Sequence, residues 1–356
     1  MALQRSGSGR SSNVPSWRKA EFQPEPLPLA VRDRRRPPRP ASAFAPRPRP
    51  RHKALVPLPA PPLPLFDRVA LAARLERALR AAPANPGADF LPRRAAEELA
   101  DRLKLVRREF AVAADVGSPA PHGAEALAAR AGATLTLRLA PSPLAVGRGA
   151  YLSAVGDIER LPLAPESCDL IVSLMALHHV NDLPGALIQI RRSLKPDGLF
   201  FGALAGGDTL TELRQSLTVA ESEILGGAAP RVAPFADVRA LGSLMQRAGY
   251  ALPVVDADPI VARYDDLWAL MRDLRAFGAA NALTLRSRKP LRRDVLARAA
   301  SIYAERFADA DGRLRATFDT IWLTGWAPHD SQPKPLRPGS ASMRLADALR
   351  VRKGDP

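Results

Sequence analysis

Short apolar runs alternate with segments of helical periodicity between residues 109 and 204, and this alternation constrains the fold more than any other feature of the chain. Strands that are apolar throughout and separated by helices form a parallel sheet that is covered on both faces. The sequence therefore predicts an α/β fold with a mostly parallel sheet. The five runs expected to form strands are FAVAADVG, TLTLRL, YLSAVG, CDLIVSLMAL and LFFGALA.

Helical segments flank this core on both sides. The stretches 65–82 and 90–106 carry apolar residues broadly along one face, with charged residues elsewhere. A helix from about Thr209 is expected to begin with a capping box, because Thr209 and Glu212 have the required spacing. The run TFDTIWLTGWAP is expected to close the sheet. Further helices are predicted near residues 236–248, 265–277 and 291–308.

The formal net charge of +16 lies mainly in one stretch of the chain. Residues 1–60 hold 13 Lys and Arg against 3 Asp and Glu, and 15 of the 36 prolines lie in residues 1–64. Prolines that alternate with like charges cannot build a packed core. We therefore interpret residues 1–64 as a disordered extension and residues 331–356 as a basic tail. An Arg-rich tether for nucleic acid is the alternative, which we weigh lower because such runs are weak motifs.

Composition excludes several classes of protein. The single Cys168 rules out intrachain disulfides and zinc sites built from several cysteines. No apolar run approaches the roughly 20 residues of a membrane span, and the N-terminus has no hydrophobic signal-peptide core. We expect a cytoplasmic location in a bacterium or the mitochondrial matrix in a eukaryote. We expect no transmembrane segment, and peripheral contact with a membrane stays open.

The candidate ligand site follows the first predicted strand, since ligands of open parallel sheets bind beyond the carboxyl ends of the strands. The turn reads Asp115-Val-Gly-Ser-Pro-Ala-Pro-His-Gly123, and Gly117 allows a tight turn with close approach of the backbone. A nucleotide-binding loop carries several glycines, whereas this turn carries two prolines. From these residues alone, a cofactor loop and a plain strand-to-helix turn are equally supported.

A wider pattern begins at Gly156 and reads GDIERLPLAPESCDLIVSLMALHHVNDLPGALIQIRRSLKPDGLFFGAL. It resembles the class I S-adenosylmethionine-dependent methyltransferases, whose motifs it carries in the family's order. The resemblance implies a Rossmann-like methyltransferase fold with a mostly parallel seven-stranded sheet, helices on both faces and S-adenosylmethionine as the cofactor. It places Asp157 and Ile158 beside the adenine. The full set of cofactor-binding residues that it implies is Asp115, Gly117, Asp157, Ile158, Ser173 and Leu174.

A narrower resemblance runs from about residue 65 to the C-terminus. It joins the chain to the family of the fifth assembly factor of mitochondrial respiratory complex I and its bacterial relatives. That family is associated with hydroxylation of an arginine in a complex I subunit, although its fold is that of a methyltransferase, so fold and chemistry must be argued separately. The segments that carry the resemblance are LFDR at 65–68, HVNDLPGAL at 179–187, GGDTLTELR at 206–214, PFADVRALGSLMQRAGY at 234–250 and GWAPHDSQPKPLRPGSA at 325–341.

Two features depart from the methyltransferase pattern. The glycine loop is reduced to DVGSPAPHG, and the end of the second strand, TLRLAPSPLAV, carries no acid for the ribose hydroxyls. Asp115 keeps the acidic position near the methionine end of the cofactor. Because the loss of one charged hydrogen-bonding partner costs about 1.5–3 kcal/mol, weak binding, altered binding and a vestigial site are all open.

Three residues are candidates for a chemical role. His178 follows the fourth strand at the predicted substrate mouth, and an unperturbed histidine titrates near neutrality, so His178 is the candidate base. A purely structural histidine is equally supported. Asp182 and Asp208 are candidates to hold the guanidinium of an arginine substrate, with helix capping as the alternative role. The adjacent pair His178 and His179 is no metal signature, and we predict no metal site.

The sequence thus predicts a methyltransferase-like domain over residues 65–330, with N-terminal helices in 65–108, a cofactor-binding core in 109–204 and substrate-side helices and closing strands in 205–330. We expect a methyltransferase-type protein that acts on a protein substrate, a complex I subunit, and binds no specific nucleic acid. The alternatives that remain open are an arginine hydroxylase on the same fold, a methyltransferase for small molecules or for carboxylates on acyl carrier protein, a non-catalytic assembly chaperone, and a nucleic-acid modifier that uses the Arg-rich extension.

Overall fold

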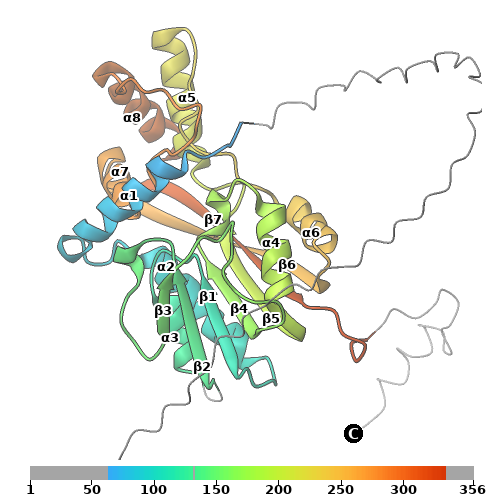
Figure 1. The fold of residues 1–356 in the computed structure, drawn as a ribbon. Helices are drawn as coiled ribbons and strands as arrows, with labels where there is room; N and C mark the ends of the chain where they lie inside the picture. Colours follow the sequence, from blue (N-terminus) through green and yellow to red (C-terminus); the bar gives the residue numbers. More distant parts are fainter. Residues whose placement is uncertain (1–62, 131–132, 334–356) are drawn as a thin grey trace, which may run out of the picture. The chain divides into compact units, whose positions relative to one another are not determined.

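Seven strands form a single sheet in the order β3-β2-β1-β4-β5-β7-β6 (Figure 1). The computed structural model describes residues 63–130 and 133–333, so the predicted extension 1–64 and tail 331–356 fall largely outside it. Strands β1 to β5 run parallel, and β7 pairs antiparallel with both β5 and β6, which confirms the predicted fold. The strands are β1 (Val112–Val116), β2 (Leu135–Ala140), β3 (Leu152–Val155), β4 (Cys168–Leu174), β5 (Leu194–Ala205), β6 (Ala251–Tyr264) and β7 (Leu314–Trp326).

The central strands are apolar throughout because helices cover both faces of the sheet. Alternate side chains of β4 point to opposite faces, as the strand period of two requires. Ile171 packs on one face with α4 (Leu183–Ser193) and α6 (Val238–Arg247). Leu170 and Val172 pack on the other face with α2 (Phe90–Lys104) and α3 (His122–Ala128). The resulting three layers place the carboxyl ends of β1 to β5 at one edge.

A third apolar cluster lies beyond those carboxyl ends. It joins α5 (Thr211–Leu225), α7 (Leu267–Ala276) and α8 (Arg293–Phe307) to the first residues of β7. Figure 1 shows α5 and α8 side by side, with α7 next to α1 (Arg68–Ala81). These elements are the helices predicted for residues 205–330, and they cover the edge at which the parallel strands end.

The ends of two helices test the capping predictions. Helix α4 shows the capping role that was the alternative for Asp182: Asp182 is its N-cap and its Oδ1 accepts a hydrogen bond from Gly185 N at 2.9 Å, with Pro184 in the first turn. The capping box predicted for α5 is wrong. The N-cap is Leu210, which has φ +54° and no side-chain acceptor.

Both residues of the predicted capping box bind β7 instead. Thr209 Oγ1 donates to Asp319 O and accepts from Asp319 N, each at 3.1 Å. The Glu212 carboxylate accepts from the Thr317 backbone N–H and hydroxyl. Buried backbone groups of β7 need partners, and this demand outweighs the local preference for a capped helix end. The two side chains therefore tie α5 to the sheet.

None of the helices that the structure describes combines the length and apolar character that a membrane span requires.

Candidate active site

A cavity of about 1120 Å³ lies at the carboxyl edge of the sheet. Its floor comes from the segments that follow the strands, from Gly117 after β1 to Glu159 after β3 and Met175 after β4. This is the location at which open parallel sheets bind ligands. The N-terminal helix α1 and the segment after α7 form the wall of the cavity opposite the strand ends.

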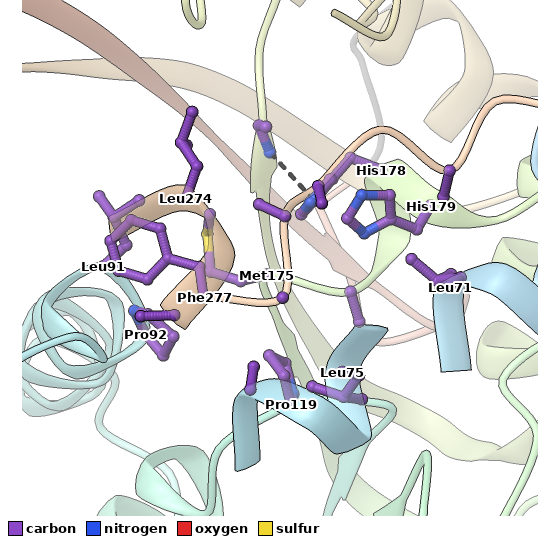
Figure 2. Close-up of a pocket in the computed structure, with 18 of the residues that line it drawn as sticks. Leu71, Leu75, Leu91, Pro92, Pro119, Met175, His178, His179, Leu274 and Phe277 are labelled. Atoms are coloured by element: carbon purple, nitrogen blue, oxygen red, sulfur yellow. Dashed lines mark hydrogen bonds between the residues drawn. The ribbon is translucent and has the colours of Figure 1, made fainter. Parts of the chain in front are cut away.

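Most of the cavity wall is apolar. Figure 2 shows Leu71 and Leu75 of α1 on one side, with Leu274 and Phe277 near Met175 on another. Met175 has φ +55°, an uncommon conformation for a residue other than glycine, and its backbone N–H donates to Ala203 O at 2.7 Å. This left-handed turn directly after β4 exposes Met175 and Ala176 to the cavity, whereas Ser173 and Leu174 stay in the core.

Residues 65–68, here called the strap, hold α1 next to the cavity. Phe66 is buried, its backbone is held by the Asn181 side chain, and its ring meets the His179 ring edge-on with centroids 5.4 Å apart. On its other side Asp67 N donates to Ala282 O at 2.8 Å. Arg68 donates to Asp157 at 2.7 Å and to Glu159 at 3.2 Å. The strap therefore joins two walls of the cavity that are far apart in sequence.

His178 and His179 form a neutral pair on the cavity wall. They lie on η3 (Leu177–His179), with ring centroids 4.1 Å apart. Burial lowers the pKa of His178 well below its usual value, with a smaller contribution from neighbouring His179, and burial lowers the pKa of His179 to about 4. The lowered pKa runs against the expectation that His178 titrates near neutrality, because burial disfavours the charged imidazolium.

One hydrogen bond also fixes the tautomer of His178. Its Nδ1 faces the backbone N–H of Ala205 at 3.4 Å, the contact drawn as a dashed line in Figure 2. Because that N–H can only donate, Nδ1 accepts and the proton of the neutral ring resides on Nε2. His178 is thus arranged to donate a hydrogen bond from Nε2.

The structure brings some of the predicted site residues to the cavity and leaves others away from it. Among the described residues, Gly117, Asp157, Ile158 and His178 line the cavity. Asp115, Ser173 and Leu174 are buried in the core behind the strand ends, outside the lining. Asp182 caps α4, and Asp208 lies in the turn before α5, so neither contributes to the lining.

Gly117 and Ile158 meet directly at the cavity. Gly117 has φ +74°, and a Cβ atom placed there would lie 2.9 Å from Ile158 Cδ1. Glycine is therefore needed for both its left-handed backbone and its lack of a side chain. This contact joins the loop after β1 to the loop after β3.

Asp115 is engaged by Arg138, an arginine that no sequence motif had singled out. The two are register partners on β1 and β2, both are fully buried, and Arg138 Nη1 lies 2.5 Å from Asp115 Oδ2. Ser118 Oγ donates to the other carboxylate oxygen, Oδ1. A signal was present, because each of the two apolar runs VAADV and TLTLRL contains one charged residue.

These residues fit S-adenosylmethionine only at its adenine end. Asp157 and Ile158 line the cavity there, with Asp157 paired to Arg68. The end of β2 brings Pro141 to the cavity and carries no carboxylate where the ribose is expected. Asp115, expected at the methionine end, is buried and already paired. The methionine and ribose parts of the cofactor therefore lack the partners that the family pattern implies.

No group of three or more His, Cys, Asp or Glu side chains that could hold a metal ion occurs in residues 63–130 and 133–333.

Comparison with known proteins places the chain in a family. Residues 114–202 match the family model described as a methyltransferase domain. The chain is 40% identical over 269 residues to "Arginine-hydroxylase NDUFAF5, mitochondrial" of Danio rerio, which covers 74% of this chain and 84% of that protein. The chain belongs to the NDUFAF5 family. The human NDUFAF5 is 38% identical over 267 residues, covering 74% of this chain and 77% of its own.

The chain is also similar to bacterial enzymes of another name. "Malonyl-[acyl-carrier protein] O-methyltransferase" of Laribacter hongkongensis is 36% identical over 265 residues, which covers 70% of this chain and 86% of that enzyme. Both groups of relatives span the methyltransferase domain and most of their own length. The comparisons thus confirm the methyltransferase domain and both of the family resemblances that the sequence motifs indicate.

Proposed function

We propose that this protein acts in the assembly of respiratory complex I, where its cavity receives an arginine-bearing segment of a subunit. One observation carries the proposal: four of the five segments that resemble the NDUFAF5 family border the same cavity, although they are spread over residues 65–250. They contribute Phe66 and Arg68, His179 and Val180, Thr209 and Leu213, and Phe235 to its lining.

The acidic edge of the cavity supports arginine as the group that is bound. Asp157 and Glu159 already hold the guanidinium of Arg68, in the forked geometry that arginine offers to carboxylates. The Arg68 side chain is 46% exposed, and exposed ion pairs contribute only about 0–1 kcal/mol. A substrate arginine can therefore displace Arg68 at low cost. In this proposal Asp157 and Glu159 take the role first assigned to Asp182 and Asp208.

His178 has a positioning role in the proposed complex. Its neutral ring offers the Nε2 proton to an oxygen of the bound segment. S-adenosylmethionine would supply the methyl group in the methylating form of the reaction, and the residues of this chain fit only its adenine end.

The modification state of complex I tests the proposal. We expect mass spectrometry of the subunits from a strain that lacks this gene to show one arginine altered relative to the parent strain. An arginine lighter by one oxygen indicates hydroxylation, and one that lacks a methyl group indicates methylation. Unaltered arginines together with normal assembly of complex I would overturn the proposal. Unaltered arginines with defective assembly would replace it by a non-catalytic chaperone.

Complementation of the same strain tests the acidic edge. The double variant Asp157→Asn/Glu159→Gln should fail to restore the arginine modification. Asp258→Asn is the matched control, because Asp258 forms a similarly exposed ion pair with Arg94 away from the cavity. Equal complementation by both variants would exclude Asp157 and Glu159 as the arginine site.

The bacterial relatives give a second candidate function. The 36% identity to an enzyme named for malonyl-acyl carrier protein favours O-methylation of a carrier-bound carboxylate as the alternative. Incubation of the purified protein with malonyl-acyl carrier protein and S-adenosylmethionine, followed by mass spectrometry of the carrier, tests it. Formation of the methyl ester would favour this function over the assembly role.

A further inference from the structure

Arg138 is fully buried, and each of its three guanidinium nitrogens has a hydrogen-bond partner. Besides the contact with Asp115, its Nη2 donates to Ser118 O and Ala145 O, both at 2.9 Å. Its Nε lies 3.2 Å from both Ala145 O and Val146 O. A buried guanidinium persists only when its charge and its donors find such partners. The loop after β1 and the turn around η2 (Pro143–Ala145) are thus folded around this side chain.

Both carboxylate oxygens of Asp115 in turn already accept hydrogen bonds from within the protein. Its Oδ2 takes the Arg138 guanidinium, its Oδ1 takes the Ser118 hydroxyl, and the backbone N–H of Ala124 at the start of α3 adds a third donor. A Cβ atom on Gly123 would lie 3.2 Å from the carboxylate, so the helix packs closely against it. The side chain is completely shielded from solvent and from the cavity.

The methionine half of S-adenosylmethionine carries an ammonium group and a carboxylate, which need an acceptor and several N–H donors. The loop from Gly117 to Pro121 is the part of this edge that faces the cavity. Pro119 and Pro121 have no N–H to donate. The carbonyl of Ser118 points to Arg138. The loop is therefore built around an internal cation and offers little to a zwitterion in the cavity.

We infer that the buried Arg138–Asp115 pair takes the place of the contacts to the methionine half of S-adenosylmethionine, so that this protein does not recognise that half of the molecule. The cavity retains Ile158 at the adenine end, while Asp157 holds Arg68 and is the proposed site of the substrate arginine. The free energy of any binding then comes from the adenosine part alone. Methionine, the sulfonium and its methyl group add no affinity.

A ligand series on the full-length protein tests this inference. Isothermal titration with S-adenosylmethionine, S-adenosylhomocysteine and adenosine, each up to about 5 mM, should give affinities within about tenfold of one another, or no saturable binding of any of them. Thermal shift at the same concentrations is an independent readout. The Laribacter hongkongensis relative, titrated in parallel, is the positive control for the cofactor stocks.

Binding of S-adenosylmethionine more than about tenfold tighter than adenosine would overturn the inference. The double variant Asp115→Asn/Arg138→Gln provides the second test, since it removes both charges and keeps groups that can hydrogen-bond. We expect it to leave the ratio of the affinities for S-adenosylmethionine and adenosine unchanged. A fall in that ratio would show that Asp115 contacts the cofactor and would also contradict the inference.

Discussion

Asn181 holds the backbone of Phe66 through both ends of its side-chain amide. Its Oδ1 accepts from Phe66 N at 2.8 Å, and its Nδ2 donates to Phe66 O at 3.1 Å, across 115 residues of sequence. The amide thereby imitates a strand partner for one residue. This contact anchors segment 65–68 to the loop between η3 and α4, so it links the LFDR and HVNDLP segments physically.

Replacement of Asn181 by Ala should destabilise the protein by about 1–3 kcal/mol, because it leaves the buried N–H and C=O of Phe66 without their partners. Urea denaturation measures the loss. Asn85→Ala is the control: Asn85 also donates through Nδ2 to a backbone carbonyl, that of Ala81, but on the surface. Equal losses in the two variants would show that the strap does not depend on Asn181.

Gly117→Ala should cost about 2–4 kcal/mol, from the left-handed backbone and from overlap with Ile158. Gly226 is the matched control because it has the same φ of +74°, and a Cβ atom placed there would have nothing within 4 Å. Gly226→Ala should cost only about 1–2 kcal/mol. Ile158→Val removes the Cδ1 atom and should rescue Gly117→Ala in part. No rescue in denaturation experiments would place the strain elsewhere.

Acidification should destabilise the protein through His178 and His179. Both have lowered pKa values in the folded state, that of His179 about 4, so the unfolded chain binds more protons below its pKa of 6.5. The sign of the linkage makes stability fall as pH drops from about 6.5 to 4, by up to about 3 kcal/mol for His179.

The variant His178→Gln/His179→Gln checks the assignment of this pH dependence. Denaturation midpoints at several pH values should show a flatter profile between pH 6.5 and about 4 than the wild type. An unchanged slope would assign the acid sensitivity to other groups.

The Arg138–Asp115 pair should behave as a coupled unit. Arg138→Gln alone leaves a buried carboxylate without its cation and should cost about 3–5 kcal/mol. Combined with Asp115→Asn it should cost clearly less than the sum of the two single variants. The exposed pair of Arg94 and Asp258 is the control for the same cycle, with a coupling of about 0–1 kcal/mol. Additive losses at Arg138 and Asp115 would contradict the coupling.

Local sequence signals predicted the elements of the fold. The apolar runs correspond to the parallel strands, and the capping role considered for Asp182 marks the start of α4. The capping box predicted from the spacing of Thr209 and Glu212 is absent, because both side chains bind backbone groups of β7. The local sequence contains no information about that strand. A capping pattern reflects hydrogen bonds that are possible within one segment. A strand about 100 residues further along the chain can offer the same side chains other partners.

The sequence predicted only some of the residues that line the cavity. Gly117, Asp157, Ile158 and His178 line the cavity because each follows a strand, and parallel strands end at one edge. Ser173 and Leu174 were predicted to bind the cofactor, but they lie in the core. The left-handed backbone at Met175 instead turns the residues that follow β4 toward the cavity. No sequence pattern predicts a positive φ angle in a residue other than glycine at this position.

The sequence by itself determined the α/β class, the order of the strands along the chain and the NDUFAF5 family, since these depend on periodicity and on motifs within short segments. Only the tertiary structure decided what Asp115 does. Its partner Arg138 stands 23 residues away on the neighbouring strand, and the register of β1 and β2 brings the two charges together. Burial then makes their pairing obligatory, because neither charge can stay in the core alone.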